Sequence, residues 1–407
     1  MLDYMIKIDK KKDCCGCSAC ANACPKHCVS MIEDNEGFLY PHIEQDICVN
    51  CGLCEKVCPI KNPIEEQVNL EQKAALFQHK DSQILAESTS GGFFSALSVW
   101  VLEKEGVVFG AAYDENLVIR HKYIDSQEDL TQFRNSKYAQ SVIGNSFQQA
   151  KKFLDENRWV CFSGTPCQLE GLHNFLRREY EKLVMVDVVC HACPSPLFFK
   201  KYLAYYESKY RQKITDAKFR DKVYGYKYSV MSLSSKGNKF YKEGIDTDVM
   251  LRAFFNNLTP RPSCFACPSK KRYHVTDFTI WDCFDVEKFS SELDNDKGVT
   301  RILLHTPKAN EVWKELKSAG NCLEISADAA VSGVKELIRP VVENPHRAEF
   351  FADLNSLSTE DVLQKYFPLT IRHHLEKQAR LWSNRLGIYN LMKKIFKCIY
   401  RKENISR

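Results

Sequence analysis

Long hydrophobic runs are absent from this sequence. No stretch approaches the ~18–20 apolar residues that cross a bilayer, so we expect no membrane-spanning segment. The first residues also lack the positively charged and apolar stretches of a secretory signal. Because disulfides are typical of secreted proteins, we do not expect the 19 cysteines to form a disulfide scaffold. These absences predict a protein of a reducing compartment, most simply the cytoplasm.

A strong charge of one sign is absent as well. The 407 residues include 57 Lys or Arg and 52 Asp or Glu, which gives a formal net charge of +5. The excess is concentrated in residues 377–407, where nine basic residues accompany a single acidic one, Glu403. Basic residues are not spread along a groove-sized surface with aromatic residues between them, so we do not expect a nucleic acid as partner.

What the sequence does have is a cysteine pattern that occurs twice near its N-terminus. Residues 14–25 and 48–59 each read Cys-x2-Cys-x2-Cys-x3-Cys-Pro. Three thiolates at this interval can bind three corners of a 4Fe-4S cubane, while the cysteine before the proline reaches across to the other cluster. Zinc takes two Cys-x2-Cys pairs per ion and does not use a third cysteine at the same interval. The spacing therefore predicts two 4Fe-4S clusters and a protein that moves electrons.

The crossed arrangement assigns to each cluster three cysteines of one run and the last cysteine of the other run. One set is Cys14, Cys17, Cys20 and Cys58, and the other set is Cys48, Cys51, Cys54 and Cys24. Cys15 and Cys28 fall outside the pattern, and we interpret them as packing residues. Cys15 is also a less favoured substitute for Cys14 as a ligand.

The two clusters need only about the first 60 residues, so a larger domain of another kind must follow. Two strand-like stretches around a turn at residues 34–37 predict the hairpin of a small ferredoxin. We expect an α+β or α/β protein. Its parts are a ferredoxin-like two-cluster domain at 1–62, a larger mixed α/β domain in two parts at 73–155 and 156–340, and a helical basic tail at 345–407.

Two short segments could bind an anion. The first comes directly before an apolar helical pattern at residues 93–101, so backbone N–H groups and hydroxyls would meet at a helix start. On spacing alone, such a start is more often a site of tight packing, and the second segment is more often a solvated loop. The two segments are Ser90, Gly91 and Gly92, and Ser136, Lys137 and Tyr138.

Four further cysteines could form a third cluster site. Residues 159–189 carry the pattern of a strand, a helix and a second strand, and the carboxyl edge of such a parallel pair is where sites are built. Two of the cysteines emerge at that edge, and two lie on a loop bounded by prolines. The four are Cys167, Cys190, Cys264 and Cys267, with Cys193 as the rival to Cys190. Buried free cysteine is the alternative interpretation.

Five motifs follow one another within about residues 70–340. They are Ser90-Gly91-Gly92, Ser136-Lys137-Tyr138, Gly164-Thr165-Pro166-Cys167-Gln168, Cys190-His191 with Pro194-Ser195-Pro196, and Ser263-Cys264-x2-Cys267. This combination resembles the family of coenzyme F420 hydrogenase/dehydrogenase beta subunits, to which a doubled N-terminal ferredoxin domain is a familiar addition. The resemblance implies a flavoprotein that carries FAD beside an iron–sulfur cluster and passes electrons between clusters and a two-electron carrier or substrate.

The resemblance also implies site residues. Contacts to FAD fall on Ser90, Gly91, Gly92, Ser136, Lys137 and Tyr138, and ligands of a third 4Fe-4S cluster on Cys167, Cys190, Cys264 and Cys267. The chain departs from the family at Ala192-Cys193, where a glycine-rich stretch is common, and at residues 281–285, which read Trp-Asp-Cys-Phe-Asp. The first departure leaves Cys190 and Cys193 open as ligands, and the second leaves the substrate pocket open.

We therefore expect an FAD-dependent iron–sulfur oxidoreductase that exchanges electrons with a ferredoxin or another redox protein and with a two-electron organic acceptor or donor. The rival hypothesis is a non-catalytic electron-transfer subunit that only passes electrons to or from a partner enzyme. A weaker rival, by family association, is a degenerate scaffold in a glycan or cell-surface assembly pathway, against which the intact ligand spacing argues. Nothing in the residues identifies a deazaflavin as the substrate.

The basic tail has a helical pattern. Apolar side chains lie on one side, at Ile388, Tyr389, Met392, Ile395, Phe396 and Ile399, and basic ones largely on the other, at Lys393, Lys394, Lys397 and Arg401. One interpretation is a helix docked on its own core. The other is a surface helix that rests on an anionic membrane or grips a partner, and it is favoured slightly because no acidic residue lies between Lys377 and Lys402.

Overall fold

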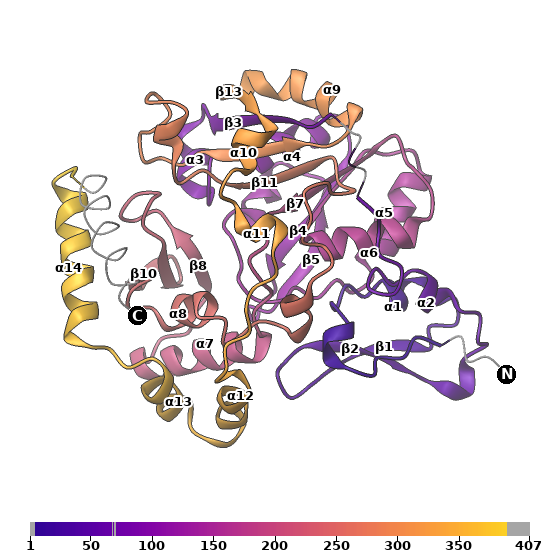
Figure 1. Ribbon diagram of the computed structural model, residues 1–407, viewed down its shortest axis with the longest axis horizontal. Helices are drawn as coiled ribbons and strands as arrows, with labels where there is room; N and C mark the ends of the chain where they lie inside the picture. The colour runs from indigo at the N-terminus through magenta and orange to yellow at the C-terminus, as the bar shows by residue number, and fades with distance from the viewer. Residues whose placement is uncertain (1–4, 67, 69–70, 389–407) are drawn as a thin grey trace.

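The computed structural model of the chain describes residues 5–66, 68 and 71–388 (Figure 1). It contains an N-terminal cysteine-rich domain, a large mixed sheet covered by helices, and a smaller sheet with the C-terminal helices beside it. The predicted fold class, a ferredoxin-like domain followed by a larger α/β domain and a helical C-terminal part, is confirmed.

The N-terminal domain is built around a hairpin. Its elements are α1 (Ala19–Ala23), β1 (Val29–Glu33), β2 (Leu39–Ile43) and α2 (Leu53–Lys56). The strands pair antiparallel, with Val29 opposite Ile43. The side chain of Asp34 closes the turn by accepting hydrogen bonds from the backbone N–H groups of Glu36 and Phe38, both at 2.9 Å. The predicted ferredoxin hairpin is confirmed.

The large sheet has eight strands in the order β13-β3-β12-β11-β7-β6-β4-β5. The strands are β3 (Lys73–His79), β4 (Val107–Tyr113), β5 (Ile119–Ile124), β6 (Val160–Gly164), β7 (Leu183–Val188), β11 (Phe278–Asp282), β12 (Thr300–Leu304) and β13 (Gly320–Ser326). The central strands β4, β6, β7 and β11 are parallel, and the outer ones are antiparallel. Strands on both sides of the expected boundary at residue 155 thus share one sheet.

Helices cover both faces of this sheet. They are α3 (Ser82–Glu87), α4 (Phe93–Leu102), α5 (Ser146–Asp155), α6 (Pro166–Leu176), α9 (Pro307–Leu316), α10 (Ala327–Val331) and α11 (Lys335–Ile338). One buried core joins α4 and α9 to the sheet through residues such as Phe93 and Trp313. A second core, on the opposite side, joins α5 and α6 through Phe147 and Leu172, and it includes Cys15 and Cys17 of the N-terminal domain.

The smaller sheet was not predicted from the sequence. Its strands are β8 (Asp216–Asp221), β9 (Val230–Ser235) and β10 (Asn238–Gly244), in the order β10-β9-β8. The helices of this part are α7 (Pro196–Tyr210), α8 (Val249–Phe255), α12 (Arg347–Ser356), α13 (Thr359–Tyr366) and α14 (Ile371–Arg385). All but α14 share one core with the sheet, rich in Phe and Tyr.

The N-terminal domain is held to the rest of the chain by buried polar contacts. Asn22 donates to the carbonyl of Gly144 at 2.8 Å, and Arg347 pairs with Glu36 in the hairpin turn. The strand connection expected between residues 159 and 189 is confirmed as β6-α6-β7 with parallel strands, which sets Cys167 and Cys190 beyond their carboxyl ends.

The described part of the chain contains no helix long and apolar enough to cross a membrane. Helix α14 ends at Arg385, and the predicted tail helix beyond residue 388 lies outside the described residues.

Candidate functional site

The first cysteine set is assembled from both runs and is buried. Cys14, Cys17 and Cys20 lie in and before α1, and Cys58 follows α2. Burial raises the pKa of the Cys20 and Cys58 thiols, and the neighbouring Cys14 thiol acts on both in the same direction. Cys58 thus lies among the cysteines of the first run, as the crossed arrangement expects. The ligand assignment itself stays a prediction.

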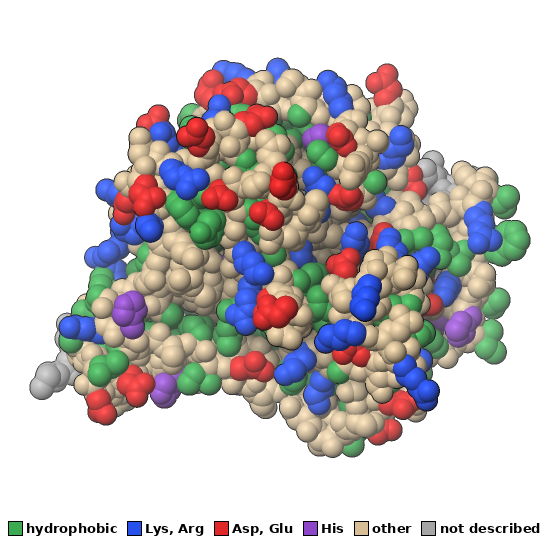
Figure 2. Space-filling model, turned by 180° about the vertical axis from the view of Figure 1, so that it is seen from behind, with side chains coloured by type: hydrophobic (Ala, Val, Ile, Leu, Met, Phe, Trp, Pro, Cys, Tyr) green, Lys and Arg blue, Asp and Glu red, His purple; other side chains and the backbone are tan. Residues whose placement is uncertain are grey.

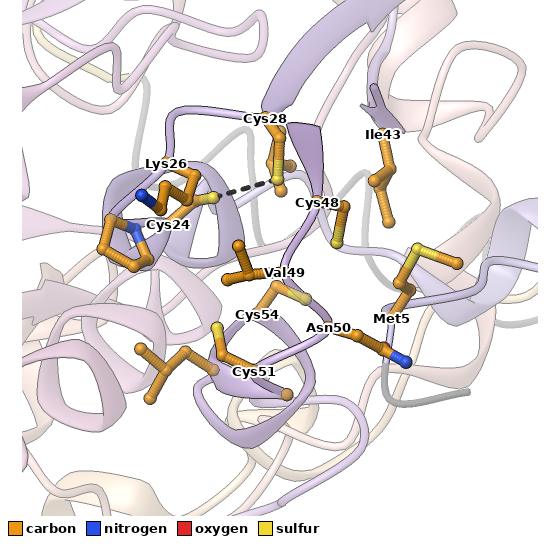
Figure 3. A pocket seen from close by; sticks show the side chains of 14 residues that line it. Met5, Cys24, Lys26, Cys28, Ile43, Cys48, Val49, Asn50, Cys51 and Cys54 are labelled. Atoms are coloured by element: carbon orange, nitrogen blue, oxygen red, sulfur yellow. Dashed lines mark hydrogen bonds between the residues drawn. The ribbon is translucent and has the colours of Figure 1, made fainter. Parts of the chain in front are cut away.

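The second set surrounds a pocket on the more exposed side of the same domain (Figure 3). Its lining includes the thiols of Cys24, Cys28, Cys48, Cys51 and Cys54. Cys51 is exposed and Cys48 is half-buried. Cys28, which we interpreted as a packing residue, contacts the Cys24 thiol at 3.2 Å and also interacts with Cys48. The second set therefore contains five thiols where the spacing predicted four.

A third group of thiols lies where the N-terminal domain meets the carboxyl ends of β6 and β7. Cys167 lies in the first turn of α6, Cys264 in a short 3-10 helix (Pro262–Ala266), and the backbone N–H of Cys193 donates to the Cys264 thiol at 3.3 Å. Cys190 and Cys193 both interact with Cys167 and Cys264, so the choice between them stays open. The full group is Cys15, Cys167, Cys190, Cys193, Cys264 and Cys267.

Cys15 joins the third group from the other domain. Its thiol interacts with Cys167 and with Cys17, so it lies between a predicted ligand of the first cluster and one of the third. We interpreted Cys15 as a packing residue or a substitute for Cys14. Its burial agrees with packing, and its side chain adds a contact between the two cysteine groups that the spacing did not predict.

The chemistry of the third group fits an iron–sulfur core. Burial raises the pKa of Cys264 to about 12 and that of Cys267 to about 11, so both thiols would keep their protons at neutral pH unless metal ions replaced them. Within the described ranges, no three His, Cys, Asp or Glu side chains converge as the ligands of a single metal ion do. A cubane holds its thiolates further apart than one ion does, because iron and sulfide stand between them.

The two segments predicted to contact FAD lie side by side. The hydroxyl of Thr89 accepts hydrogen bonds from the backbone N–H of Ser136, at 2.7 Å, and from its hydroxyl, at 3.1 Å. Strand β8 adjoins both segments, because Asn135 exchanges hydrogen bonds with the backbone of Arg220, and Lys222 donates to the carbonyl of Ser90 at 2.7 Å. The structure thus brings together residues that are about 50 and 130 positions apart in the sequence.

Some predicted contacts already have partners. The backbone N–H of Gly91 donates to the Thr300 hydroxyl at 2.8 Å, and a Cβ at Gly91 would lie 2.0 Å from the carbonyl oxygen of Phe77. Gly91 is therefore needed for close packing. Gly92 caps α4 with a φ of +84°, and the atom nearest to a Cβ at Gly92, on His79, would be 3.1 Å away. Of the two glycines, Gly92 is the one that leaves room for the expected helix-start site.

Two lysines at this place have no acidic partner among the described residues. Lys137 donates to the carbonyls of Arg134 and Asn135, and Lys222 donates to three carbonyls; neither forms an ion pair with a described Asp or Glu. Burial lowers the pKa of each ammonium to about 8. A bound anion beside either ammonium would supply negative charge to it, so each lysine is a candidate contact for a dinucleotide.

Aromatic contacts join the segment Ser136-Lys137-Tyr138 to the third cysteine group. Tyr138 stacks on Phe254 with ring centroids 4.6 Å apart and planes within 9°, and Phe254 meets His191 edge-on at 4.9 Å. His191 is the neighbour of Cys190 in the chain. The stack also occupies one face of the Tyr138 ring, so that face is not available to a flavin.

The stretch at residues 281–285, where the sequence departs from the family pattern, forms ion pairs. Asp282 pairs with Arg220 at 2.8 Å and accepts from the Tyr226 hydroxyl at 3.1 Å, and Asp285 pairs with Arg301. The contact with Arg220 ties the end of β11 to β8, and the contact with Arg301 ties the residues after β11 to β12. Sequence reasoning missed Arg220 and Lys222, since a strand of the smaller sheet gave no motif to follow.

Comparison with known proteins assigns the two main regions. Residues 157–329 match the family model for the C terminus of the coenzyme F420 hydrogenase/dehydrogenase beta subunit, and residues 13–62 match the model for a 4Fe-4S dicluster domain. The F subunit of the F(420)H(2) dehydrogenase of Methanosarcina mazei is 24% identical over 183 residues, which are 42% of this chain and 51% of that protein. The coenzyme F420-dependent sulfite reductase of Methanocaldococcus jannaschii is 24% identical over 326 residues, 77% of this chain and 47% of that protein.

Among solved structures, one protein of the F420-reducing [NiFe] hydrogenase complex from Methanosarcina barkeri aligns with a TM-score of 0.43 and 15% identity, over 76% of this chain and 97% of that one. The chain spans about half the length of the two curated relatives. The predicted family and the predicted dicluster domain are thus confirmed by their matches. Residues 157–329 are thus similar to the C terminus of the coenzyme F420 hydrogenase/dehydrogenase beta subunit, and residues 13–62 are similar to a 4Fe-4S dicluster domain.

Proposed function

We propose that this protein is an FAD-dependent oxidoreductase that passes electrons between a redox partner protein, its 4Fe-4S clusters and a two-electron organic acceptor or donor. The dicluster domain would hold two clusters through the eight cysteines of the doubled pattern, and Cys167, Cys190 or Cys193, Cys264 and Cys267 would hold a third. FAD, when bound, converts between the one-electron chemistry of the clusters and two-electron chemistry.

One observation carries this proposal. The thiol group at the carboxyl ends of β6 and β7 and the paired segments at Thr89 and Ser136 are joined by the contacts of Tyr138, Phe254 and His191. A candidate site for a cluster and a candidate site for an anionic dinucleotide are therefore neighbours. The likeness to coenzyme F420-dependent relatives supports a redox function, while the substrate of this chain is left unassigned.

The test begins with anaerobic purification of the full chain and measurement of iron and flavin. We expect about twelve irons per chain and FAD released by acid. Iron without flavin would contradict the proposal of an FAD-dependent enzyme and would favour a non-catalytic electron-transfer subunit. If flavin is present, stopped-flow mixing of the reduced protein with candidate acceptors then identifies the substrate class.

The glycines give a sharper test of the flavin site. Gly92→Val should lower FAD occupancy and leave the iron content unchanged, because the pyrophosphate needs a close approach to the start of α4. Gly91→Ala is the contrasting variant: its Cβ would meet the Phe77 carbonyl, so it should destabilise the whole fold. Full flavin loading in Gly92→Val would show that this glycine has only a packing role.

Lys137→Met should lower FAD affinity without a change in iron content, because it removes an ammonium that donates to backbone carbonyls and to no described carboxylate.

We further propose that the C-terminal helix is a peripheral contact to an anionic membrane surface. Helix α14 docks on the smaller sheet by its polar side, where Lys377 pairs with Glu243 at 2.6 Å and Arg380 with Asp246 at 3.2 Å. Its apolar side faces solvent: Ile371, Leu375, Trp382 and Leu386 are each 60% to 80% exposed. Figure 2 shows hydrophobic side chains along the edge of the molecule that α14 forms.

The charges around this apolar stripe suit anionic lipid. The exposed Arg385 flanks it, Arg372 pairs with Glu376 on the same helix, and the sequence beyond residue 388 adds six Lys or Arg and one Glu. A Trp and Leu face with basic residues at its margins is the composition of helices that lie in a membrane interface. The alternative interpretation, a helix docked by its apolar side, does not describe α14 as far as residue 388.

Co-sedimentation of the full chain with vesicles of phosphatidylcholine and phosphatidylserine tests this contact. Binding should fall as salt increases, and it should fall at least several-fold in the double variant Trp382→Ser, Leu386→Ser. Val342→Ser is the matched control, because Val342 is 81% exposed and lies outside α14. If the full chain ignores the vesicles, or if the double variant binds as well as the control, the membrane proposal is wrong. A shift from dimer to monomer in the double variant would instead identify a second copy as the occupant.

A further inference from the structure

Arg261 is the largest fully buried side chain among the described residues, with 1% of its surface exposed. Its guanidinium donates to three acceptors: Nε to the carbonyl of Cys14 at 2.7 Å, Nη1 to Oε1 of Gln140 at 2.8 Å, and Nη2 to the carbonyl of Leu39 at 3.0 Å. The ring of Tyr40 lies 4.1 Å from the guanidinium carbon. The hydrogen bonds are satisfied, and none of these partners carries a formal negative charge.

Other buried arginines differ from Arg261 in this respect. Arg220, Arg301 and Arg347 are also at least nine-tenths buried, and each pairs with a carboxylate, on Asp282, Asp285 and Glu36 respectively. Among the described residues, no Asp or Glu forms an ion pair with Arg261. A guanidinium stays protonated in proteins, and burying a charge without a counter-charge is strongly unfavourable. The compensating negative charge must come from another group.

The surroundings of Arg261 show where that charge would lie. Its side chain contacts the backbone of Cys14, a predicted ligand of the first cluster. Its own backbone lies within the third cysteine group, since its N–H donates to the carbonyl of Cys193 at 2.8 Å and its carbonyl accepts from the N–H of Cys264 at 2.9 Å. Arg261 therefore touches both groups.

The close packing of the first cysteine run around Arg261 also indicates that the compensating charge lies at this run. Gly16 lies between Cys15 and Cys17 with a φ of +73°, and a Cβ there would lie 2.8 Å from Nη1 of Arg261 and 2.5 Å from Nε2 of Gln140. Gln140 in turn donates to the carbonyl of Cys15 at 2.9 Å. The loop that is predicted to hold the first cluster is shaped to let a cation approach its backbone.

We infer that Arg261 is the counter-cation of the first cluster and of the third, and that it raises the reduction potential of both. This inference rests on the proposed cluster sites. A cubane with four thiolates carries net negative charge, and one-electron reduction by the partner protein adds to that charge without making or breaking a bond. A fixed positive charge in a buried, low-dielectric place stabilises the reduced form more than the oxidised form.

The experiment compares Arg261→Gln with Arg261→Lys in the full chain, with iron content and an anaerobic redox titration followed by electron paramagnetic resonance as readouts. In Arg261→Gln we expect full iron and a first cluster that is harder to reduce. The ratio of reduced to oxidised cluster at a fixed potential should fall about tenfold, which is a shift of about 59 mV for one electron. Arg261→Lys, which keeps the charge, should stay near the unchanged protein.

Arg347→Gln is the control, because it removes a buried cation from the same domain junction that is paired with Glu36. Its potentials should not move. Full iron and unchanged potentials in Arg261→Gln would overturn the inference. If iron is lost from Arg261→Gln and kept in Arg261→Lys, the charge is required and the inference holds; if iron is lost from both, Arg261 has only a structural role. Should the unchanged protein lack a third cluster signal, that part of the proposed function fails, while the response of the first cluster still tests Arg261.

Discussion

The two cysteine runs are alike in sequence and different in environment. Cys14, Cys17 and Cys20 of the first run are all buried, because α1 packs against α6 of the large domain. In the second run, Cys51 is exposed and Cys48 is half-buried. The same ligand pattern therefore meets protein on one side and solvent on the other. Since burial and hydrogen bonds to sulfur set cluster potentials, two identical motifs are expected to hold clusters with different properties.

The two cysteine runs also have different neighbours in the structure. The first run faces Arg261, Gln140 and the third cysteine group, so it is the inner one. The second run has exposed apolar side chains next to it, at Ile47 and Val49. We expect the second cluster to exchange electrons with the partner protein and the first to pass them inward.

The largest effect should come from Cys58→Ala. Cys58 lies in the second run but beside the cysteines of the first, so its loss should remove the inner cluster and about four irons per chain. The resonance signal that disappears should be the one that Cys20→Ala also removes. Cys322→Ala, at a half-buried cysteine outside all three groups, is the control and should keep every iron. Loss of the signal that depends on Cys51 would instead show that each run holds its own cluster.

A second comparison separates Cys24 from Cys28 in the outer site. Both thiols line the pocket, and only Cys24 fits the doubled spacing. Cys24→Ala should lose the outer cluster, about four irons per chain, whereas Cys28→Ala should keep it. Iron analysis of the two variants, purified side by side without oxygen, decides between them. The reverse outcome would move the fourth ligand to Cys28.

A smaller effect is expected from Val49→Glu. The exposed Val49 lies between Cys48 and Cys51, so a carboxylate there should weaken docking of an electron donor and slow reduction several-fold. Reduction by a ferredoxin should be followed by stopped-flow absorbance, with iron content as a check that the cluster remains. Val342→Glu, at an exposed valine outside the N-terminal domain, is the control. Equal rates in both variants would place donor docking elsewhere.

The smallest effect concerns the stability of the fold at acid pH, through one buried histidine. His121 lies on β5, its Nε2 contacts the carbonyl of Ser163 at 2.9 Å, and burial lowers its pKa to about 4. In the unfolded chain the pKa returns to about 6.5, so the unfolded state binds the proton first and stability falls as the pH drops from about 6.5 toward 4. Between pH 7 and 5 the loss should be about 2 kcal/mol.

His121→Gln keeps a donor and cannot titrate, so its thermal midpoint should depend less on pH over this range. His346→Gln, at an exposed histidine, is the control and should keep the pH dependence of the unchanged protein. If His121→Gln and the control lose stability in parallel, His121 is not the acid-sensitive group.

Local patterns in the sequence predicted much of this protein. The doubled spacing identified the dicluster domain, because ligand chemistry fixes the intervals between cysteines. The strand-helix-strand pattern at residues 159–189 identified β6, α6 and β7 and the edge at which Cys167 and Cys190 emerge, because apolar periodicity follows from the regular geometry of the elements.

Other features could not be predicted in the same way. The smaller sheet has short strands without a motif, and β8 supplies Arg220 and the adjoining Lys222 to the candidate flavin site across more than 80 residues of sequence. The polar docking of α14 was also unexpected, because the pattern of a helix does not say which side will meet the rest of the chain.

The sequence by itself predicted which residues would bind iron and that the protein moves electrons, because these predictions depend on residue type and on short, fixed spacing. Only the tertiary structure decided that one of two equal runs is buried, that Cys15 meets Cys167, and that Arg261 lies between two cysteine groups without a described carboxylate partner. These contacts join positions as far as 247 residues apart. Burial and charge depend on what the whole fold brings together, and no local pattern encodes that.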